Sequence, residues 1–150
     1  MSKVKDVDRG YKDLLERAKM HGVIKVGILT ADADKTYDDA VTVLQVAMWN
    51  EFGTEHIPER SFLRAWFDEN ESKCREAVKR MASAVLAGKY KPEQALQLVA
   101  QRFVGEIQKR MAQGVPPPNA ASTIARKGSD KPLIDTGQLR SSISYVVEPK

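Results

Sequence analysis

The sequence predicts an α+β fold: a small, mostly antiparallel sheet packed against a long antiparallel helical hairpin, with an extended C-terminal arm. Two segments, 24–28 and 143–147, show the two-residue period of half-buried strands. Two longer segments, 74–86 and 92–111, carry apolar residues at helical spacing and are joined by a short connection. We therefore expect one domain over the whole chain, with residues 115–135 as its arm.

The N-terminal half is predicted as a helix, a strand and a shorter mixed element. Apolar residues separated by charges indicate an amphipathic helix over 6–20. The strand at 24–28 follows, and the polar, Asp-rich segment 31–38 is predicted to be a connection. Residues 42–44 are predicted as a brief returning strand. This strand passes into one or two helical turns that end at Gly53, because glycine adopts positive φ without steric cost.

The helical hairpin has the strongest pattern. Three acidic residues are predicted to mark the start of its first helix, where the helix dipole favours negative charge (Asp68, Glu69 and Glu71). Favourable pairs four residues apart are expected from Glu71 to Arg75 and from Glu76 to Arg80. Pro92 is predicted to open the second helix, and Gly114 to end it.

The C-terminal part begins with a stiff, extended proline run at 115–118. Residues 119–131 are small, polar and basic and have no periodicity, which is typical of functional or disordered loops. Asp135 and Gln138 are spaced as in a capping box, which predicts one or two helical turns over 136–142 before the last strand.

The composition argues against several classes of protein. The 150 residues are 42% hydrophobic and 29% charged, which allows a buried core. The net charge of +4 is mildly basic, and the chain is well short of the long runs of one charge that are typical of nucleic-acid-binding tails. No stretch approaches the roughly 20 apolar residues that cross a bilayer, and residues 1–9 lead into no apolar signal segment. A single cysteine forms no intrachain disulfide and no Cys-based zinc site. We expect neither a membrane protein nor a small disulfide-rich one.

No arrangement of side chains predicts catalysis, a metal site or a cofactor. His21 and His56 lack His or Cys partners at ligand spacing and are interpreted as exposed loop residues. Acid–base work needs burial or crowding of carboxylates, whereas Asp38–Asp39 and Asp68–Glu69 flank solvated elements. Cys74 lies on an apolar helical stripe and is predicted to be a core residue. We therefore expect a protein that is not an enzyme and that binds no cofactor.

A basic segment of the arm supports an alternative function. Arg126, Lys127 and Lys131 provide mobile positive charge, and phosphate contacts need little more. Asp130 dilutes this charge, and no aromatic residue lies among them to stack on bases. A DNA-binding accessory protein that uses this arm is therefore the second interpretation.

Two segments carry more turn and packing chemistry than a loop needs. The first signature is Asn50-Glu51-Phe52-Gly53-Thr54 followed by Ile57-Pro58-Glu59-Arg60-Ser61-Phe62-Leu63-Arg64. The second signature is Pro132-Leu133-Ile134-Asp135-Thr136-Gly137-Gln138-Leu139-Arg140-Ser141-Ser142-Ile143. In this order, with the two long helices between them, they resemble the signatures of the tail-completion, or neck, proteins of tailed bacteriophages.

The resemblance implies a structural function. Proteins of this family assemble as a ring, expected to be a hexamer in the virion, at the head-proximal end of the tail. There they join the tail tube and terminator to the head connector and line the path of the DNA. The resemblance implies a virion protein of a phage or prophage that is assembled in the host bacterial cytoplasm, without a membrane. Its expected partners are further copies of itself, those tail and head proteins and, non-specifically, packaged DNA.

The signature residues and the arm also have expected roles. The large apolar residues Phe52, Phe62, Leu63 and Leu139 are predicted to be core residues, and Gly53 and Gly137 to allow backbone turns. Four charged residues are interpreted either as ion-paired within the chain or as contacts between subunits (Glu51, Arg60, Arg64 and Arg140). The arm is expected to reach a neighbouring subunit, as in the heterologous contacts of rings.

Overall fold

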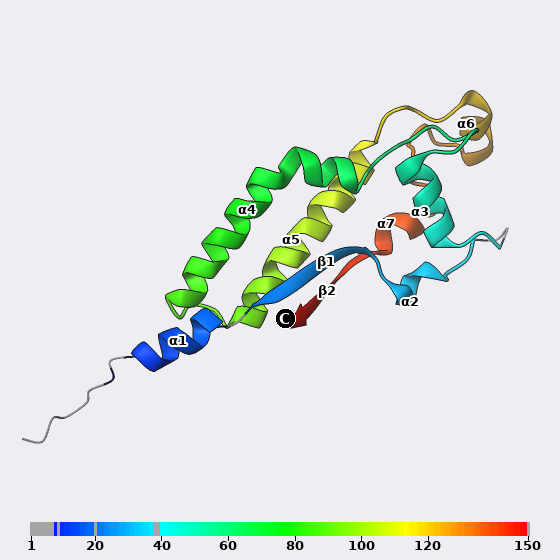
Figure 1. Cartoon of the computed structure of the whole chain (residues 1–150). Helices are drawn as coiled ribbons and strands as arrows, with labels where there is room; N and C mark the ends of the chain where they lie inside the picture. Colours follow the sequence, from blue (N-terminus) through cyan, green and yellow to red (C-terminus); the bar gives the residue numbers. More distant parts are fainter. Residues whose placement is uncertain (1–7, 9, 20, 38–39, 150) are drawn as a thin grey trace, which may run out of the picture.

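The computed structural model describes residues 8, 10–19, 21–37 and 40–149. Two long helices and a two-stranded sheet run along the length of an elongated molecule (Figure 1). The helix α1 lies at one end, and four short helices gather at the other. The elements are α1 (Tyr11–Lys19), β1 (Gly22–Ile28), α2 (Thr30–Ala33), α3 (Val43–Phe52), α4 (Arg64–Leu86), α5 (Pro92–Gln113), α6 (Ala121–Lys127), α7 (Gln138–Ser141) and β2 (Ile143–Pro149).

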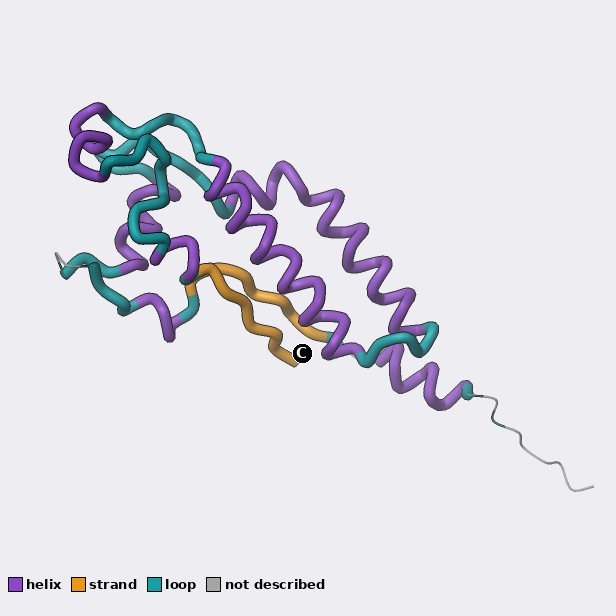
Figure 2. The backbone as a smooth tube through the Cα atoms, turned by 180° about the vertical axis from the view of Figure 1, so that it is seen from behind, coloured by secondary structure: helices purple, strands orange, loops and turns teal. Residues whose placement is uncertain are grey.

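The sheet consists of β1 and β2, as the two-residue periods predicted. The strands are antiparallel, and their register runs from the pair Gly22–Pro149 to the pair Ile28–Ile143. Both strands pack against α5 (Figure 2). The chain is therefore an α+β domain in which the N-terminal and C-terminal parts meet in one sheet.

The predicted helical hairpin is confirmed, and the start of its first helix is corrected. The helices α4 and α5 pack against each other, with the ring centroids of Trp66 and Phe103 5.6 Å apart between them. As predicted, α5 begins at Pro92 and ends before Gly114, whose φ is 96°. The helix α4 begins at Arg64, so the acidic residues expected at its start lie further along it.

The expected side-chain pairs of α4 are present. Arg75 contacts Glu71 at 2.6 Å, and Arg80 contacts Glu76 at 3.1 Å. The acidic Glu69 has a different role from the one predicted, because its carboxylate binds Arg110 of α5, with the closest N–O distance 2.6 Å. This hydrogen bond lowers the pKa of Glu69 and outweighs the opposing effect of desolvation. Glu69 therefore links the two helices of the hairpin and does not cap one of them.

The segment before Gly53 differs from its prediction. Residues 42–44 form no strand beyond a single bridge between Thr36 and Thr42. Thr42 is the N-cap of α3: its hydroxyl accepts from the Gln45 N–H, and the Gln45 side chain accepts from the Thr42 N–H. The capping box fixes a ten-residue helix in place of the predicted one or two turns.

The other N-terminal elements follow the prediction in part. The helix expected over 6–20 is described as α1, and its predicted ends lie outside the described residues. The Asp8 carboxylate accepts from the N–H groups of the first turn of α1, including that of Tyr11 at 2.7 Å. The connection at 31–38 includes part of the short helix α2. The pair Asp38–Asp39 lies outside the described residues.

Two C-terminal predictions also need correction. Residues 121–127, expected to lack regular structure, form α6. The short helix expected before the last strand is α7, but Asp135 does not cap it. Its N-cap is Gly137, with φ of 80°, and the Gln138 side chain donates to the Thr36 carbonyl at 3.2 Å.

The core lies where α3, α4, α5, α7 and β2 meet. Its most deeply buried side chains include Phe62, Ile107, Met111 and Val43. Leu139 and Ile143 of the second signature are also 2% exposed. Cys74 is buried in the same cluster, as its position on the apolar stripe predicted. The core therefore sits at the end of the hairpin where the two signatures converge.

Candidate functional site

The first signature forms a tight reversal after α3. Gly53 has φ of 74°, and a Cβ atom there would lie 3.0 Å from the Glu59 nitrogen and 3.2 Å from the Ile57 carbonyl oxygen. Only glycine fits this backbone approach. Thr54 closes the turn: its N–H donates to the Ile57 carbonyl at 2.7 Å, and its hydroxyl accepts from the Ile57 N–H at 2.9 Å. The Arg60 N–H then donates to the Asn50 carbonyl at 2.6 Å, which returns the chain to α3.

The buried Glu51 carboxylate caps the next helix. One oxygen accepts from the N–H groups of Phe62 and Leu63, both at 3.0 Å. The other accepts from the Arg64 N–H at 2.9 Å and from the Ser61 hydroxyl at 2.7 Å. These three successive N–H groups lie where α4 begins, and such groups have no partner within the helix. Glu51 of α3 therefore completes α4 and places a negative charge at the positive end of its dipole.

Glu51 is held in its charged form by these contacts. Burial raises the pKa of its carboxyl, but the hydrogen bonds from Leu63, Ser61, Arg64 and Phe62 outweigh this effect, and the pKa is lowered. Glu51 is also the only charged residue of α3. A lone charge within an otherwise uncharged helix is the sequence signal that could have identified a buried and partnered carboxylate.

Arg60 ties the reversal to the arm. Its side chain is buried, and its guanidinium donates to the carbonyls of Pro117 at 2.7 Å and Pro118 at 3.0 Å. A third, longer bond at 3.4 Å reaches the Asn50 side chain. Burial lowers the pKa of Arg60. The two proline carbonyl oxygens are neutral acceptors, and each accepts from a different nitrogen of the planar guanidinium.

The arm is anchored to its own chain at both ends. Val115 is 3% exposed and Leu133 is 9% exposed, both within the core cluster. With the proline carbonyls held by Arg60, the part of the arm between the two anchors is α6, which lies at the same end of the molecule as α3 (Figure 1). That the arm reaches a neighbouring subunit stays a prediction.

Arg64 and Phe52 lie together at the surface. The Arg64 guanidinium donates to Glu59 at 2.7 Å and lies 4.8 Å from the centre of the Phe52 ring. Phe52 is 57% exposed, so the prediction that it is a core residue is wrong. Phe52 lies about 100° around the helix from Glu51 and shares the exposed side of α3 with Leu44 and Met48. The predictions for Phe62 and Leu139 are confirmed, and Leu63 is partly buried against the core.

The second signature packs beside the first. Pro132 and Leu133 are buried, and Leu133 has φ of 63°, uncommon for a residue with a side chain. The Thr136 hydroxyl accepts from the Gln138 N–H at 3.3 Å, and the buried Ser142 hydroxyl donates to the Gln138 carbonyl at 2.9 Å. The side chain of Arg140 is exposed, whereas its carbonyl accepts from Gln108 of α5 at 3.2 Å.

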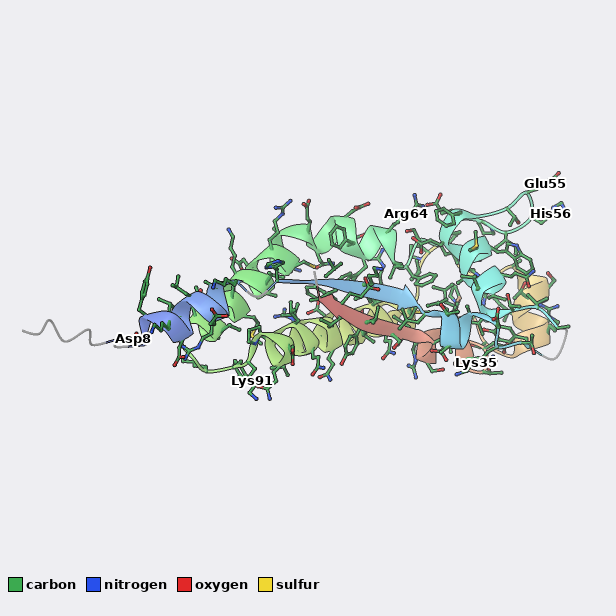
Figure 3. The ribbon with its side chains drawn as sticks, turned by 60° about the horizontal axis from the view of Figure 1, so that its bottom comes forward. Asp8, Lys35, Glu55, His56, Arg64 and Lys91 are labelled. Atoms are coloured by element: carbon green, nitrogen blue, oxygen red, sulfur yellow. The ribbon has the colours of Figure 1, made fainter. Side chains whose placement is uncertain are left out.

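Both signatures line one open groove with a volume of about 780 Å³. The helix α3, the reversal, the arm and the segment before α7 form its walls. Its lining includes Asn50, Pro58 and Arg60 of the first signature, and Leu133, Asp135, Thr136, Gly137 and Leu139 of the second. Trp49, His56 and Arg126 also face it. His56 lies at the tip of the reversal, at the far end of the molecule from Asp8 and Lys91 (Figure 3).

The remaining candidates are placed as follows. His21 and His56 are exposed, as predicted. Arg126 and Lys127 belong to α6, and Lys131 lies in the exposed segment after it. Across the described ranges, no three His, Cys, Asp or Glu residues are grouped so that they could hold a metal ion. No described helix combines the length and the apolar character needed to cross a bilayer.

The sequence identified the residues of the two signatures but did not predict their contacts. Glu51 contacts the start of α4 and Arg60 contacts the arm, and neither the hydrophobic period nor a motif spacing links these residues in the sequence. Comparisons of the chain with protein-family models, with curated proteins and with solved structures found no match.

Proposed function

We propose that this chain is a non-enzymatic structural protein of a tailed phage or prophage. It completes the head-proximal end of the tail and joins the tail tube and terminator to the head connector. In this role it assembles into a ring within the virion and is made in the host cytoplasm.

The observation that carries the proposal is the convergence of the two signatures. Although a long helical hairpin separates them in the sequence, their residues line one groove at one end of the molecule. Their charged residues Glu51 and Arg60 are used in hydrogen bonds within the chain. Such residues fix the shape of the surrounding surface. A joining protein acts by binding its partners through a surface of fixed shape.

Extract complementation tests the proposal. A phage or prophage that lacks the gene for this chain is expected to accumulate DNA-filled heads and separate tails. Addition of the purified chain is expected to restore joined, infectious particles. A variant that lacks the Arg60 fork, Arg60→Leu, should fail to restore them, whereas Arg80→Leu on the exposed face of α4 should succeed. Normal particles formed without the chain would contradict the proposal.

A further inference from the structure

The outer face of α3 is apolar along its whole length. The exposed residues of this helix are Leu44, Gln45, Met48, Trp49 and Phe52, and none of them is charged. The four large apolar side chains are 41%, 52%, 36% and 57% exposed. The one polar side chain, that of Gln45, is engaged in the capping box with Thr42.

The inner face of the same helix is already in the core. Val43 is 0% exposed and Ala47 is 6% exposed, and Glu51 fixes the rotation of the helix by its bonds to the start of α4. A contiguous exposed apolar face on a protein typically marks an interaction surface. Within the described part of the chain, the large apolar side chains on the outer face of α3 stay 36–57% exposed, so this face is available to another molecule.

The apolar surface continues onto α4. The guanidinium of Arg64 lies over the Phe52 ring, and Phe67, one turn further along α4, is 52% exposed. We call Leu44, Met48, Trp49, Phe52 and Phe67 the α3 patch. Large side chains of this kind carry roughly 200 Å² each, so the α3 patch exposes about 500 Å².

We propose that a second copy of this chain docks on the α3 patch, in a twofold contact that pairs α3 with α3. Two such patches would together bury about 1,000 Å², which is the area that separates specific interfaces from incidental ones. A twofold axis places the same surface on both sides. The residues Leu44, Met48 and Phe52, four apart, form the ridge that packs into the partner helix.

The charges around the patch favour a second copy over other occupants. The outer face of α3 carries no charge that would repel its own copy. It also offers no positive charge to a nucleic acid, whose binding depends on such charge. At the rim, Arg64 and Glu59 are of opposite sign and already paired at 2.7 Å, so two identical rims can face each other. The pairing concerns the free chain and does not depend on the proposed function.

Sedimentation velocity of the full chain over a concentration series tests the pairing. The expected result is a reversible dimer of twice 16.7 kDa. Met48→Glu and, separately, Leu44→Lys place a charge in the contact and should weaken dimerisation at least about 100-fold, since an unpaired charge would be buried. Val78→Glu is the matched control, because Val78 is an equally exposed apolar residue of α4 outside the patch. It should dimerise as the unmodified chain does.

Circular dichroism and thermal unfolding show whether each variant keeps the native fold. A folded monomer for either α3 variant beside a dimeric control supports the contact. A chain that stays monomeric throughout the micromolar range would overturn the proposal. So would a dimer that both α3 substitutions leave intact, or a species larger than a dimer.

Discussion

Replacement of Glu51 by glutamine tests whether a side chain of α3 caps α4. The substitution keeps the size of the side chain but leaves one acceptor oxygen where there were two. In the native chain the two oxygens accept four short hydrogen bonds, one oxygen from the N–H groups of Phe62 and Leu63 and the other from the Arg64 N–H and the Ser61 hydroxyl. The second oxygen also accepts a longer bond, at 3.4 Å, from the Arg64 side chain. In the variant, two of these four donors would face an amide NH₂ group that cannot accept from them.

The cost follows from the number of donors that lose an acceptor. A buried donor without a partner costs about 1–3 kcal/mol, and the Ser61 hydroxyl is free to turn, so we expect a loss of about 3 kcal/mol in the free energy of unfolding. For a domain of this size, such a loss lowers the melting temperature by about 6–12 °C. Urea denaturation followed by circular dichroism measures the loss directly.

Glu55→Gln is the matched control, because Glu55 is exposed in the same reversal. Its effect should stay within about 0.5 kcal/mol. If Glu51→Gln were no more destabilising than this control, the capping role of the carboxylate would be refuted.

The pH dependence of stability provides a second measure of the same site. The folded chain lowers the pKa of Glu51, so its contribution is complete above the ordinary glutamate pKa of about 4.3 and is lost as the pH falls through the folded value. The stability difference between the native chain and Glu51→Gln should therefore shrink on acidification below that ordinary value. A difference that is constant down to the acid-unfolding range would contradict the assigned ionisation.

Three further predictions concern the reversal and the arm. Gly53→Ala should destabilise the chain by about 1–3 kcal/mol, because Gly53 has a positive φ of 74°. The control Gly105→Ala, at a position of α5 with room for a methyl group, should stabilise the chain by about 0.5–1 kcal/mol. Thermal unfolding measures both changes. In Arg60→Lys a single ammonium group replaces the planar guanidinium that binds two carbonyls of the arm, so the arm should be held less firmly. Limited proteolysis should therefore cleave the arm faster in this variant than in the control Arg80→Lys, and equal cleavage rates would refute the anchoring role. If the basic residues Arg126, Lys127 and Lys131 contact DNA, their joint replacement by serine should make the plot of log binding constant against log salt concentration shallower by about 2–3 for duplex DNA. An unchanged slope would exclude this role.

The parts of the fold that depend on local pattern could be predicted from the sequence. The two strands follow from their two-residue periods, and α5 from its first-turn proline and final glycine. The start of α4 could not be predicted, because its cap is supplied by Glu51, which precedes the helix by thirteen residues. The local sequence offered Asp68 and Glu69 as a plausible but incorrect start.

The sequence predicted which residues belong to the candidate site but not how they are arranged in space. The exposure of Phe52 depends on the rotation of α3 that the contacts of Glu51 fix. The role of Arg60 depends on carbonyls of the distant arm. The helix α6 could not be predicted with the same certainty as α5, because residues 121–127 span only about two turns, although Ala121, Ile124 and Ala125 lie at helical spacing. Thr42 suits a strand by its propensity, but its spacing from Gln45 is that of a capping box, and this sequence signal identifies it as a helix cap.

The carboxylate that α3 contributes to α4 couples the opening of the first turn of α4 to the position of α3. The amide protons of Phe62, Leu63 and Arg64 belong to the first turn of a helix, where exchange with solvent is normally fast. Because these protons are bonded to a buried carboxylate of α3, we expect them to exchange more slowly than other first-turn amides. A molecule that holds α3 in place would thereby also hold the first turn of α4.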